Sequence, residues 1–318
     1  INIVVVGLGK IGLPLAVQFA TKAHSVVGVD INPETVEAVN LGIEPFPGEY
    51  GMFAALQETV STGHLRATAY YEEAIPDADV VVVVVPLLVD GLGRPDFHWM
   101  DSATASIGAN LSKDTLVIYE TTLPIGTTRG RWKPQLEQLS GLEEGKHFHL
   151  AFSPERVLTG RIFEDLRKYP KLIGGLTNDG AVAARQFYES VLDFDARSDL
   201  PCPNGVWDLG SPEAAELAKL AETSYRDVNI ALANQFALHA DELGVDVYRV
   251  IEACNSQMYS HIHQPGISVG GHCIPVYPRL YLSTDSRPGV VRAARDLNSD
   301  MPVAMVSRLE EAMGSLGG

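Results

Sequence analysis

The chain has 318 residues, 46% of them hydrophobic, and its 24 basic against 40 acidic side chains leave a formal net charge of −16 at pH 7. This length predicts two domains, each with its own core. The negative charge would repel nucleic-acid phosphates, so we expect no nucleic-acid partner. The longest apolar run, residues 80–89, is too short to span a bilayer, and we expect no membrane role.

The chain has three cysteines, Cys202, Cys254 and Cys273. Their number is odd, none belongs to a Cys-x-x-Cys pair, and the chain does not open on an apolar leader. These features favour free thiols in a reducing cytoplasm over a disulfide framework. We assign no metal ligands.

Apolar runs typical of strands alternate with helical patterns through the first two thirds of the chain. The expected strands are residues 3–6, 26–29, 80–85, 116–119, 149–152 and 172–173. This alternation predicts an α/β domain with a doubly wound parallel sheet covered on both faces. Residues 201–210, rich in proline, glycine and asparagine, interrupt the pattern. We place a domain boundary there, with one domain at 1–203 and a helical domain at 204–318.

The second domain is predicted to be all helical, with a long central helix at residues 211–243. Apolar residues recur there near the helical period. Ser211 suits the N-cap, Pro212 the first turn and Gly244 the end of this helix. Further helices are expected at residues 248–255 and 290–313, on either side of the segment that contains Cys273.

A glycine motif lies directly after the first strand and opens the first helix. Gly7 permits a tight turn, Gly9 allows the backbone to approach a pyrophosphate, and Gly12 allows close packing of helix and strand. Asp30 ends the next strand, where a carboxylate can accept hydrogen bonds from a ribose diol and would repel a 2′-phosphate. The motif predicts a Rossmann-type domain that binds NAD. The alternative is a glycine turn that serves packing alone.

Cys273 follows Gly270, Gly271 and His272, so we expect it in a glycine-bounded loop where a substrate can reach the thiol. On spacing alone, a structural role for this cysteine stays open. Lys219 on the long helix could accept an alcohol proton or stabilise an oxyanion if burial lowers its pKa. The alternative is a solvated lysine, which is the usual state of a lysine on a helix. Glu155 lies just past a strand end, at the edge where α/β sheets place ligands, and the alternative is an ordinary acidic residue of a surface loop.

Together these motifs resemble the UDP-glucose/GDP-mannose dehydrogenase family, in particular its branch acting on UDP-N-acetylhexosamines. The resemblance covers nearly the whole chain. It is carried by the glycine motif and by residues 120–128, 152–156, 219–234, 264–266 and 270–276.

The resemblance implies oxidation of a sugar C6 alcohol to a carboxylate with two NAD. An aldehyde, a thiohemiacetal and a thioester on Cys273 follow one another before hydrolysis. It implies Lys219 as acid/base and oxyanion partner, Glu155 as a base in hydrolysis, and Thr122 as a positioner of water or cofactor. The implied cofactor-binding residues are Gly7, Gly9, Lys10, Ile11, Gly12, Asp30, Pro86 and Thr122. The implied substrate-binding residues are Glu155, Arg156, Lys219, Arg226, Asn229, Gly270, Gly271 and His272.

Two positions in the catalytic region depart from the family pattern. Thr223 stands where the family has asparagine, and Tyr277 stands where it has aspartate. Tyrosine is neutral near pH 7 and larger than aspartate. Thr223 and Tyr277 stay among the candidate catalytic residues because of the positions they occupy. Because they differ from the family residues, incomplete oxidation or NAD-assisted epimerisation is one alternative. A protein that binds NAD or a nucleotide sugar without turnover is the second alternative.

The resemblance also bears on partners. It implies a nucleotide-diphosphate sugar, UDP-linked, as the ligand and a homodimer formed through the 211–243 helix. The family's third, C-terminal nucleotide-binding domain is not expected within this chain, which ends at Gly318.

Overall fold

The structure is a computed structural model that describes residues 1–91, 93–271, 273–287 and 289–314. The chain divides into two compact units. The first comprises Ile1–Leu88 and Asp96–Lys219, and the second comprises Val89–Pro95 and Leu220–Gly318. The boundary expected after residue 203 lies before this division, because the last strand of the sheet and the start of the long helix still belong to the first unit.

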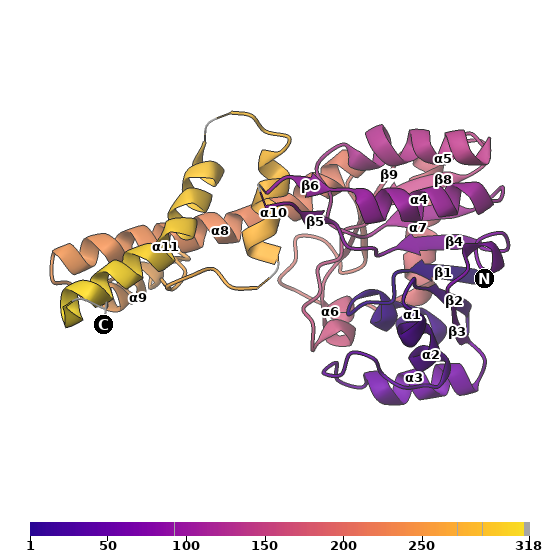
Figure 1. The fold of residues 1–318 in the computed structure, drawn as a ribbon, viewed down its shortest axis with the longest axis horizontal. Helices are drawn as coiled ribbons and strands as arrows, with labels where there is room; N and C mark the ends of the chain where they lie inside the picture. Colours follow the sequence, from indigo (N-terminus) through magenta and orange to yellow (C-terminus); the bar gives the residue numbers. More distant parts are fainter. Residues whose placement is uncertain (92, 272, 288, 315–318) are drawn as a thin grey trace. The chain divides into compact units, whose positions relative to one another are not determined.

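The first unit is built on an eight-stranded sheet in the order β10-β9-β8-β7-β4-β1-β2-β3 (Figure 1). Its strands are β1 (Asn2–Val6), β2 (Ser25–Val29), β3 (Leu65–Thr68), β4 (Val80–Val83), β7 (Leu116–Tyr119), β8 (His149–Phe152), β9 (Lys171–Gly175) and β10 (Val206–Asp208). The predicted α/β class is confirmed, and most neighbouring strands are parallel. β3 and β10 were not predicted.

One pair departs from the expected parallel sheet, because β8 and β9 are antiparallel, with Ala151 opposite Gly175 and Phe152 opposite Gly174. The chain that leaves β8 stays at the edge of the sheet where β7 and β8 end, and β9 starts from that edge and runs back. The first residue of β9, Lys171, therefore lies at the carboxyl end of its neighbour β8.

Helices cover both faces of this sheet (Figure 1). They are α1 (Gly12–Ala20), α2 (Pro33–Asn40), α3 (Met52–Ser61), α4 (His98–Asn110), α5 (Lys133–Ser140), α6 (Ile162–Lys168) and α7 (Asn178–Val191), with short turns η1 (Tyr71–Glu73) and η2 (Thr128–Trp132). On one face, Phe19 of α1 meets Phe187 of α7 edge to face at 5.3 Å between ring centroids. On the other, Tyr119 of β7 stacks on Trp132 at 5.5 Å. The first contact joins two helices on one face, and the second packs Trp132 of η2 against the sheet, which is buried on both sides.

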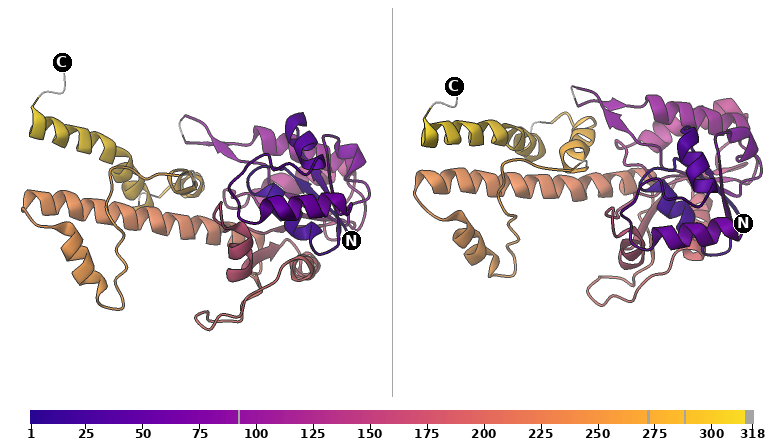
Figure 2. Two further views of the ribbon diagram at one scale, coloured as in Figure 1. Left: turned by 90° about the horizontal axis from the view of Figure 1, so that it is seen from below. Right: turned by 60° about the horizontal axis from the view of Figure 1, so that its bottom comes forward.

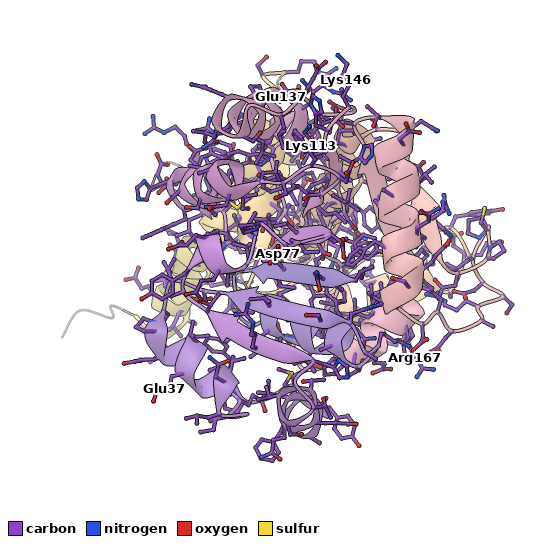
Figure 3. The ribbon with its side chains drawn as sticks, turned by 90° about the vertical axis from the view of Figure 1, so that its right-hand side faces the viewer. Glu37, Asp77, Lys113, Glu137, Lys146 and Arg167 are labelled. Carbon is purple, nitrogen blue, oxygen red and sulfur yellow. The ribbon has the colours of Figure 1, made fainter. Side chains whose placement is uncertain are left out.

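The sheet and helices of the first unit enclose an apolar core, and many charged side chains lie at its periphery. Residues Ile3–Val6 of β1 are all at most 1% exposed, as expected for a central strand. Figure 3 shows Glu37, Lys146 and Arg167 at the periphery of this unit.

The second unit is mostly helical. It contains most of the 31-residue α8 (Pro212–Glu242), which runs unbroken in both views of Figure 2, followed by α9 (Val247–Asn255), α10 (Cys273–Leu282) and α11 (Val290–Met313). A short hairpin, β5 (Leu88–Val89) with β6 (Pro95–Asp96), spans the boundary of the two units. The predicted helices at 211–243, 248–255 and 290–313 are confirmed to within a residue at each end.

α10 was not predicted, and it corrects the expectation that Cys273 lies in a loop. Gly271 has φ +81°, a conformation that favours glycine, but Cys273 itself is the first residue of α10. The helix tolerates Pro275 because the N–H groups of the first turn have no partner within the helix. No helix in the described ranges is long and apolar enough to cross a membrane.

Candidate active site

The glycine motif forms a cradle between β1 and α1 that fits a dinucleotide. Gly7 has φ +94° and donates its N–H to the carbonyl of Val29 at 2.8 Å. A Cβ on Gly12 would lie 1.8 Å from the carbonyl oxygen of Gly7, so only glycine allows the helix to start there. A Cβ on Gly9, in contrast, would meet nothing within 4 Å. The space over Gly9 is open where a pyrophosphate would approach the start of α1.

Asp30 at the end of β2 is tied to this cradle. Its Oδ2 accepts the backbone N–H of Leu8 at 2.7 Å, and its Oδ1 accepts that of Asn32 at 2.9 Å. Each carboxylate oxygen has a further lone pair that could accept from a ribose hydroxyl. The carboxylate thus fixes the turn and remains able to bind the diol.

A hollow opens beside the glycine turn and includes Lys10, an exposed residue of the predicted cofactor set. Its lining also includes Gly9, Phe46, Glu49 and Gly160. Glu49 accepts the backbone N–H groups of Gly160 at 2.7 Å and Ile162 at 2.6 Å, so it holds the two loops of this hollow together.

The other predicted cofactor residues differ in exposure. Ile11 is half-buried and precedes α1, Pro86 is exposed and follows β4, and Thr122 follows β7 with its side chain 5% exposed. Their contacts with the cofactor remain predictions.

Glu155 belongs to a cluster at the carboxyl ends of β7 and β8. Lys171 Nζ lies 2.8 Å from Oε2 of Glu120 and 2.8 Å from Oε2 of Glu155. Tyr188 of α7 donates its hydroxyl to Oε1 of Glu120 at 2.6 Å. Oε1 of Glu155 accepts the backbone N–H of Arg156 at 2.6 Å. Each carboxylate of the cluster is therefore held on both oxygens.

Burial and charge separate the acidities of these groups. Burial raises the pKa of Glu120 to about 7, against the attraction of Lys171. For Glu155 the attraction of Lys171 and its hydrogen bonds outweigh burial, and the pKa lies below the ordinary value. Burial alone would lower the pKa of Lys171, but the two carboxylates raise it. Near neutral pH the site thus presents an ionised Glu155 beside a charged lysine.

Glu120, Lys171 and Tyr188 were not identified from the sequence. Glu120 opens the 120–128 segment that contributes to the family resemblance, two residues before Thr122, and an acid at the end of a buried strand was the available signal. Nothing in the sequence indicated Lys171, because its place depends on the reversal of β9.

Lys219 lies on α8 at the end of the first unit, and its side chain is buried, with 9% exposure. One turn earlier, Glu216 accepts hydrogen bonds from Gly126 and Thr128. Because a lysine on a helix is usually solvated, this burial agrees with a role in the site. Its catalytic role remains a prediction.

In the second unit, side chains of α8 hold the segment that leads to Cys273. Asn229 donates Nδ2 to the carbonyl of His261 at 2.6 Å and accepts the N–H of His263 at 3.0 Å. Asn234 accepts the N–H of Gly266 at 2.9 Å. The amide of Asn229, expected to bind substrate, is engaged with the protein on both sides, so its contact with substrate remains a prediction.

The remaining predicted residues of the second unit differ in exposure. Cys273, Arg226, Gly270 and Gly271 are exposed, whereas Tyr277 is half-buried. Thr223 is buried and donates its hydroxyl to the carbonyl of Leu220 at 3.1 Å. His272 lies outside the described residues. Arg156, in the first unit, donates to the carbonyl of Pro170 at 3.4 Å.

The dinucleotide cradle and the buried carboxylate at the adjacent sheet edge define the class of an NAD-dependent dehydrogenase. The family model for the NAD-binding domain of the UDP-glucose/GDP-mannose dehydrogenase family matches residues 1–192, and the model for its central domain matches residues 213–300. The chain belongs to this family and is an NAD-dependent nucleotide-sugar dehydrogenase.

Known relatives support the same assignment. A UDP-N-acetyl-D-mannosamine dehydrogenase from Pyrococcus horikoshii is 38% identical over 313 residues, which are 98% of this chain and 71% of that protein. The structure of a UDP-D-ManNAc dehydrogenase from the same organism matches with a TM-score of 0.90, covering 98% of this chain and 72% of that one. An NDP-N-acetyl-D-galactosaminuronic acid dehydrogenase from Methanosarcina mazei, 29% identical, matches with a TM-score of 0.86 over 99% of this chain and 69% of that one.

Proposed function

We propose that the protein oxidises the C6 hydroxyl of a UDP-N-acetylhexosamine to the carboxylate through a thioester on Cys273. The observation that carries the proposal is the match over 98% of the chain to a relative named for UDP-N-acetyl-D-mannosamine, in a chain that retains Cys273, Lys219 and Glu155. Because similar proteins are named for different N-acetylated sugars, the sugar is proposed only as a class.

The proposed chemistry divides into two oxidations and a hydrolysis. Bound NAD would supply the hydride acceptor for each oxidation. Lys219 would accept the proton of the C6 hydroxyl as the aldehyde forms and would stabilise the oxyanion. The Cys273 thiolate would then add to the aldehyde carbon, and the alkoxide of this thiohemiacetal, stabilised by the protonated Lys219, would lose a second hydride to NAD and leave the thioester.

Hydrolysis would complete the reaction. Glu155 would take a proton from water as the water oxygen adds to the thioester carbon, and the carbon–sulfur bond then breaks to release the Cys273 thiolate and the carboxylic acid. Thr122 would position the water or the cofactor. Arg156 and Arg226 are proposed to bind the substrate, since diphosphates need donors in an acidic protein.

Incomplete oxidation or epimerisation is the second candidate. It is favoured by Tyr277, and by Thr223, whose hydroxyl is bonded to the helix backbone at Leu220. A hydroxyl so engaged does not reproduce the paired donor and acceptor of an amide.

One experiment decides among these candidates: a panel of UDP- and GDP-sugars assayed for NADH formation and product mass. Two NADH per carboxylate, lost in Cys273→Ala, would support the proposal. One NADH with an aldehyde would support incomplete oxidation, and an isomer without net NADH would support epimerisation. Binding of NAD or a nucleotide sugar with no turnover of any sugar would support the second alternative, a protein that only binds these ligands.

We further propose a cytoplasmic homodimer. The described cysteines are all free thiols, which suits a reducing compartment. α8 exposes four large apolar side chains that a partner could cover, Leu217, Tyr225, Leu232 and Phe236. Light scattering of the purified chain tests the dimer, and replacing Tyr225 and Leu232 by Ser should yield monomers.

A further inference from the structure

Three charged groups share one buried site at the carboxyl edge of the sheet. Glu120 follows β7, Glu155 follows β8, and Lys171 reaches them because β9 runs antiparallel to β8. The side chain of Glu120 is fully buried, that of Lys171 is 5% exposed and that of Glu155 is 12% exposed. Glu155 is thus the member of the trio that is most open to a ligand.

The charges of this trio do not balance when both carboxyls are ionised. One ammonium between two carboxylates leaves a net charge of −1 in a buried place, which is costly. One proton removes that cost. With Glu120 neutral, the attraction of Lys171 falls on Glu155 alone. With Glu120 ionised, Lys171 is shared and a second negative charge faces Glu155.

We propose that Glu120 and Lys171 are positioning residues for Glu155, and that a single proton on Glu120 sets how strongly Glu155 acts as a base. This inference rests on the proposed role of Glu155 in thioester hydrolysis. When Glu120 is neutral, Glu155 is the weaker base. When Glu120 ionises, Glu155 becomes the stronger base, because its negative charge is less well compensated.

The acidities of the groups agree with this arrangement. The pKa of Glu120 is about 7, raised by burial, so Glu120 gains or loses its proton near neutral pH. The pKa of Glu155, in contrast, is lowered. The titratable groups that face Glu120 are Glu155 from the segment after β8, Lys171 from β9 and Tyr188 from α7. Burial and the carboxylate of Glu120 raise the pKa of Tyr188, so its hydroxyl remains a donor.

The test is Glu120→Gln, read on the decay of the acyl-enzyme. The amide can accept a hydrogen bond from Lys171 and donate one to Tyr188, so the packing is kept. Because an amide does not ionise, residue 120 stays neutral at every pH, as protonated Glu120 is. Rapid quench with intact-protein mass follows the acyl group on Cys273 between about pH 6 and pH 8. We expect equal decay at the low end and slower decay than wild type at the high end, by about twofold to tenfold for a base weaker by about one pKa unit.

Tyr188→Phe supplies a second variant with a different expectation. It removes the 2.6 Å hydrogen bond that stabilises ionised Glu120. Decay of the acyl-enzyme should therefore still accelerate with pH, unlike in Glu120→Gln, but the acceleration should occur at a higher pH than in wild type. A decay profile that coincides with wild type in both variants would overturn the inference.

Glu155→Gln separates failure of the inference from failure of the proposed function. If Glu155→Gln accumulates acyl-enzyme but Glu120→Gln behaves as wild type, the inference alone is wrong. If no variant forms an acyl-enzyme, the proposed function is wrong. Carboxyl carbon NMR of the ligand-free protein then still tests the charge coupling. The signal of a glutamate that titrates near neutral pH must be absent from the spectrum of Glu120→Gln. Glu216→Gln identifies the signal of Glu216, whose pKa burial also raises to about 7.

Discussion

Glu216 accepts two hydrogen bonds from Thr128, one from the backbone N–H at 2.9 Å and one from the hydroxyl at 2.7 Å, across 88 residues of sequence. Its other carboxylate oxygen accepts the N–H of Gly126 at 2.5 Å. These donors lie at the start of η2, where backbone N–H groups have no partner within the helix. The contact joins α8, which carries Lys219, to the segment that carries Thr122.

We predict that Glu216→Gln destabilises the protein by about 1–3 kcal/mol at about pH 5, because an amide nitrogen cannot accept from Gly126 or Thr128. Urea unfolding measures the change. Glu213→Gln is the matched control on the same helix turn, since its main charged contact is a partly exposed ion pair with Arg129 and its loss should cost less than about 1 kcal/mol. Equal losses in the two variants would contradict the prediction.

The same carboxyl predicts a pH dependence of stability. Burial raises the pKa of Glu216 from its ordinary value of 4.5 to about 7 in the folded state. The stability it contributes is therefore full below pH 4.5 and is lost as the pH rises to about 7, at up to about 1.4 kcal/mol per pH unit. The difference in unfolding free energy between wild type and Glu216→Gln should narrow over that range. A constant difference would show that the folded-state pKa is not raised.

The βα alternation and the glycine turn could be predicted from the sequence because both depend on local residues. Gly12 must be glycine because a helix that follows a strand at once packs closely against it, and this strand–helix order can be seen in the sequence. Lys171 could not be found, since its place at the carboxyl edge results from the reversal of β9. Cys273 was expected in a loop because Gly270 and Gly271 lie shortly before it, and glycines are typical of loops. The sequence did not show that α10 begins at Cys273.

The two motif glycines predict opposite outcomes when each is replaced by alanine. In Gly12→Ala the methyl group would lie 1.8 Å from a backbone oxygen, and we expect a loss of about 3 kcal/mol or more of stability. In Gly9→Ala the methyl group meets nothing within 4 Å, so the unfolding free energy should stay within about 0.5 kcal/mol.

Gly9→Ala should nevertheless weaken NAD binding. Its methyl group would occupy the space where the pyrophosphate approaches, and we expect the Kd for NAD to rise about tenfold or more. Calorimetric titration with NAD, beside thermal melting of both variants, provides the measurement. A Gly9→Ala protein that binds NAD as tightly as wild type would show that the cofactor does not use this cradle.

Asn234→Ala should loosen the segment before Cys273 without changing the NAD site. It removes the acceptor for the N–H of Gly266 and the donor to Asn298. Hydrogen exchange of residues 256–271 should become faster, and turnover should fall while the Kd for NAD is unchanged. Gln235→Ala, an exposed neighbour on α8, is the control and should change neither quantity. Unchanged exchange in Asn234→Ala would show that this amide does not hold the segment.

The last prediction concerns the two departures from the family pattern. If Thr223 and Tyr277 limit the second half of the reaction, then Thr223→Asn with Tyr277→Asp should speed the decay of the acyl-enzyme. An asparagine restores a paired donor and acceptor, and an aspartate restores a negative charge that can orient a lysine. We expect an acceleration of about tenfold or more, corresponding to about 1.4 kcal/mol at the barrier. The first NADH should form at an unchanged rate, which pre-steady-state absorbance measures. Slower decay in the double variant would mean that Tyr277 and Thr223 are adapted to this site, and that the wild-type residues themselves support hydrolysis.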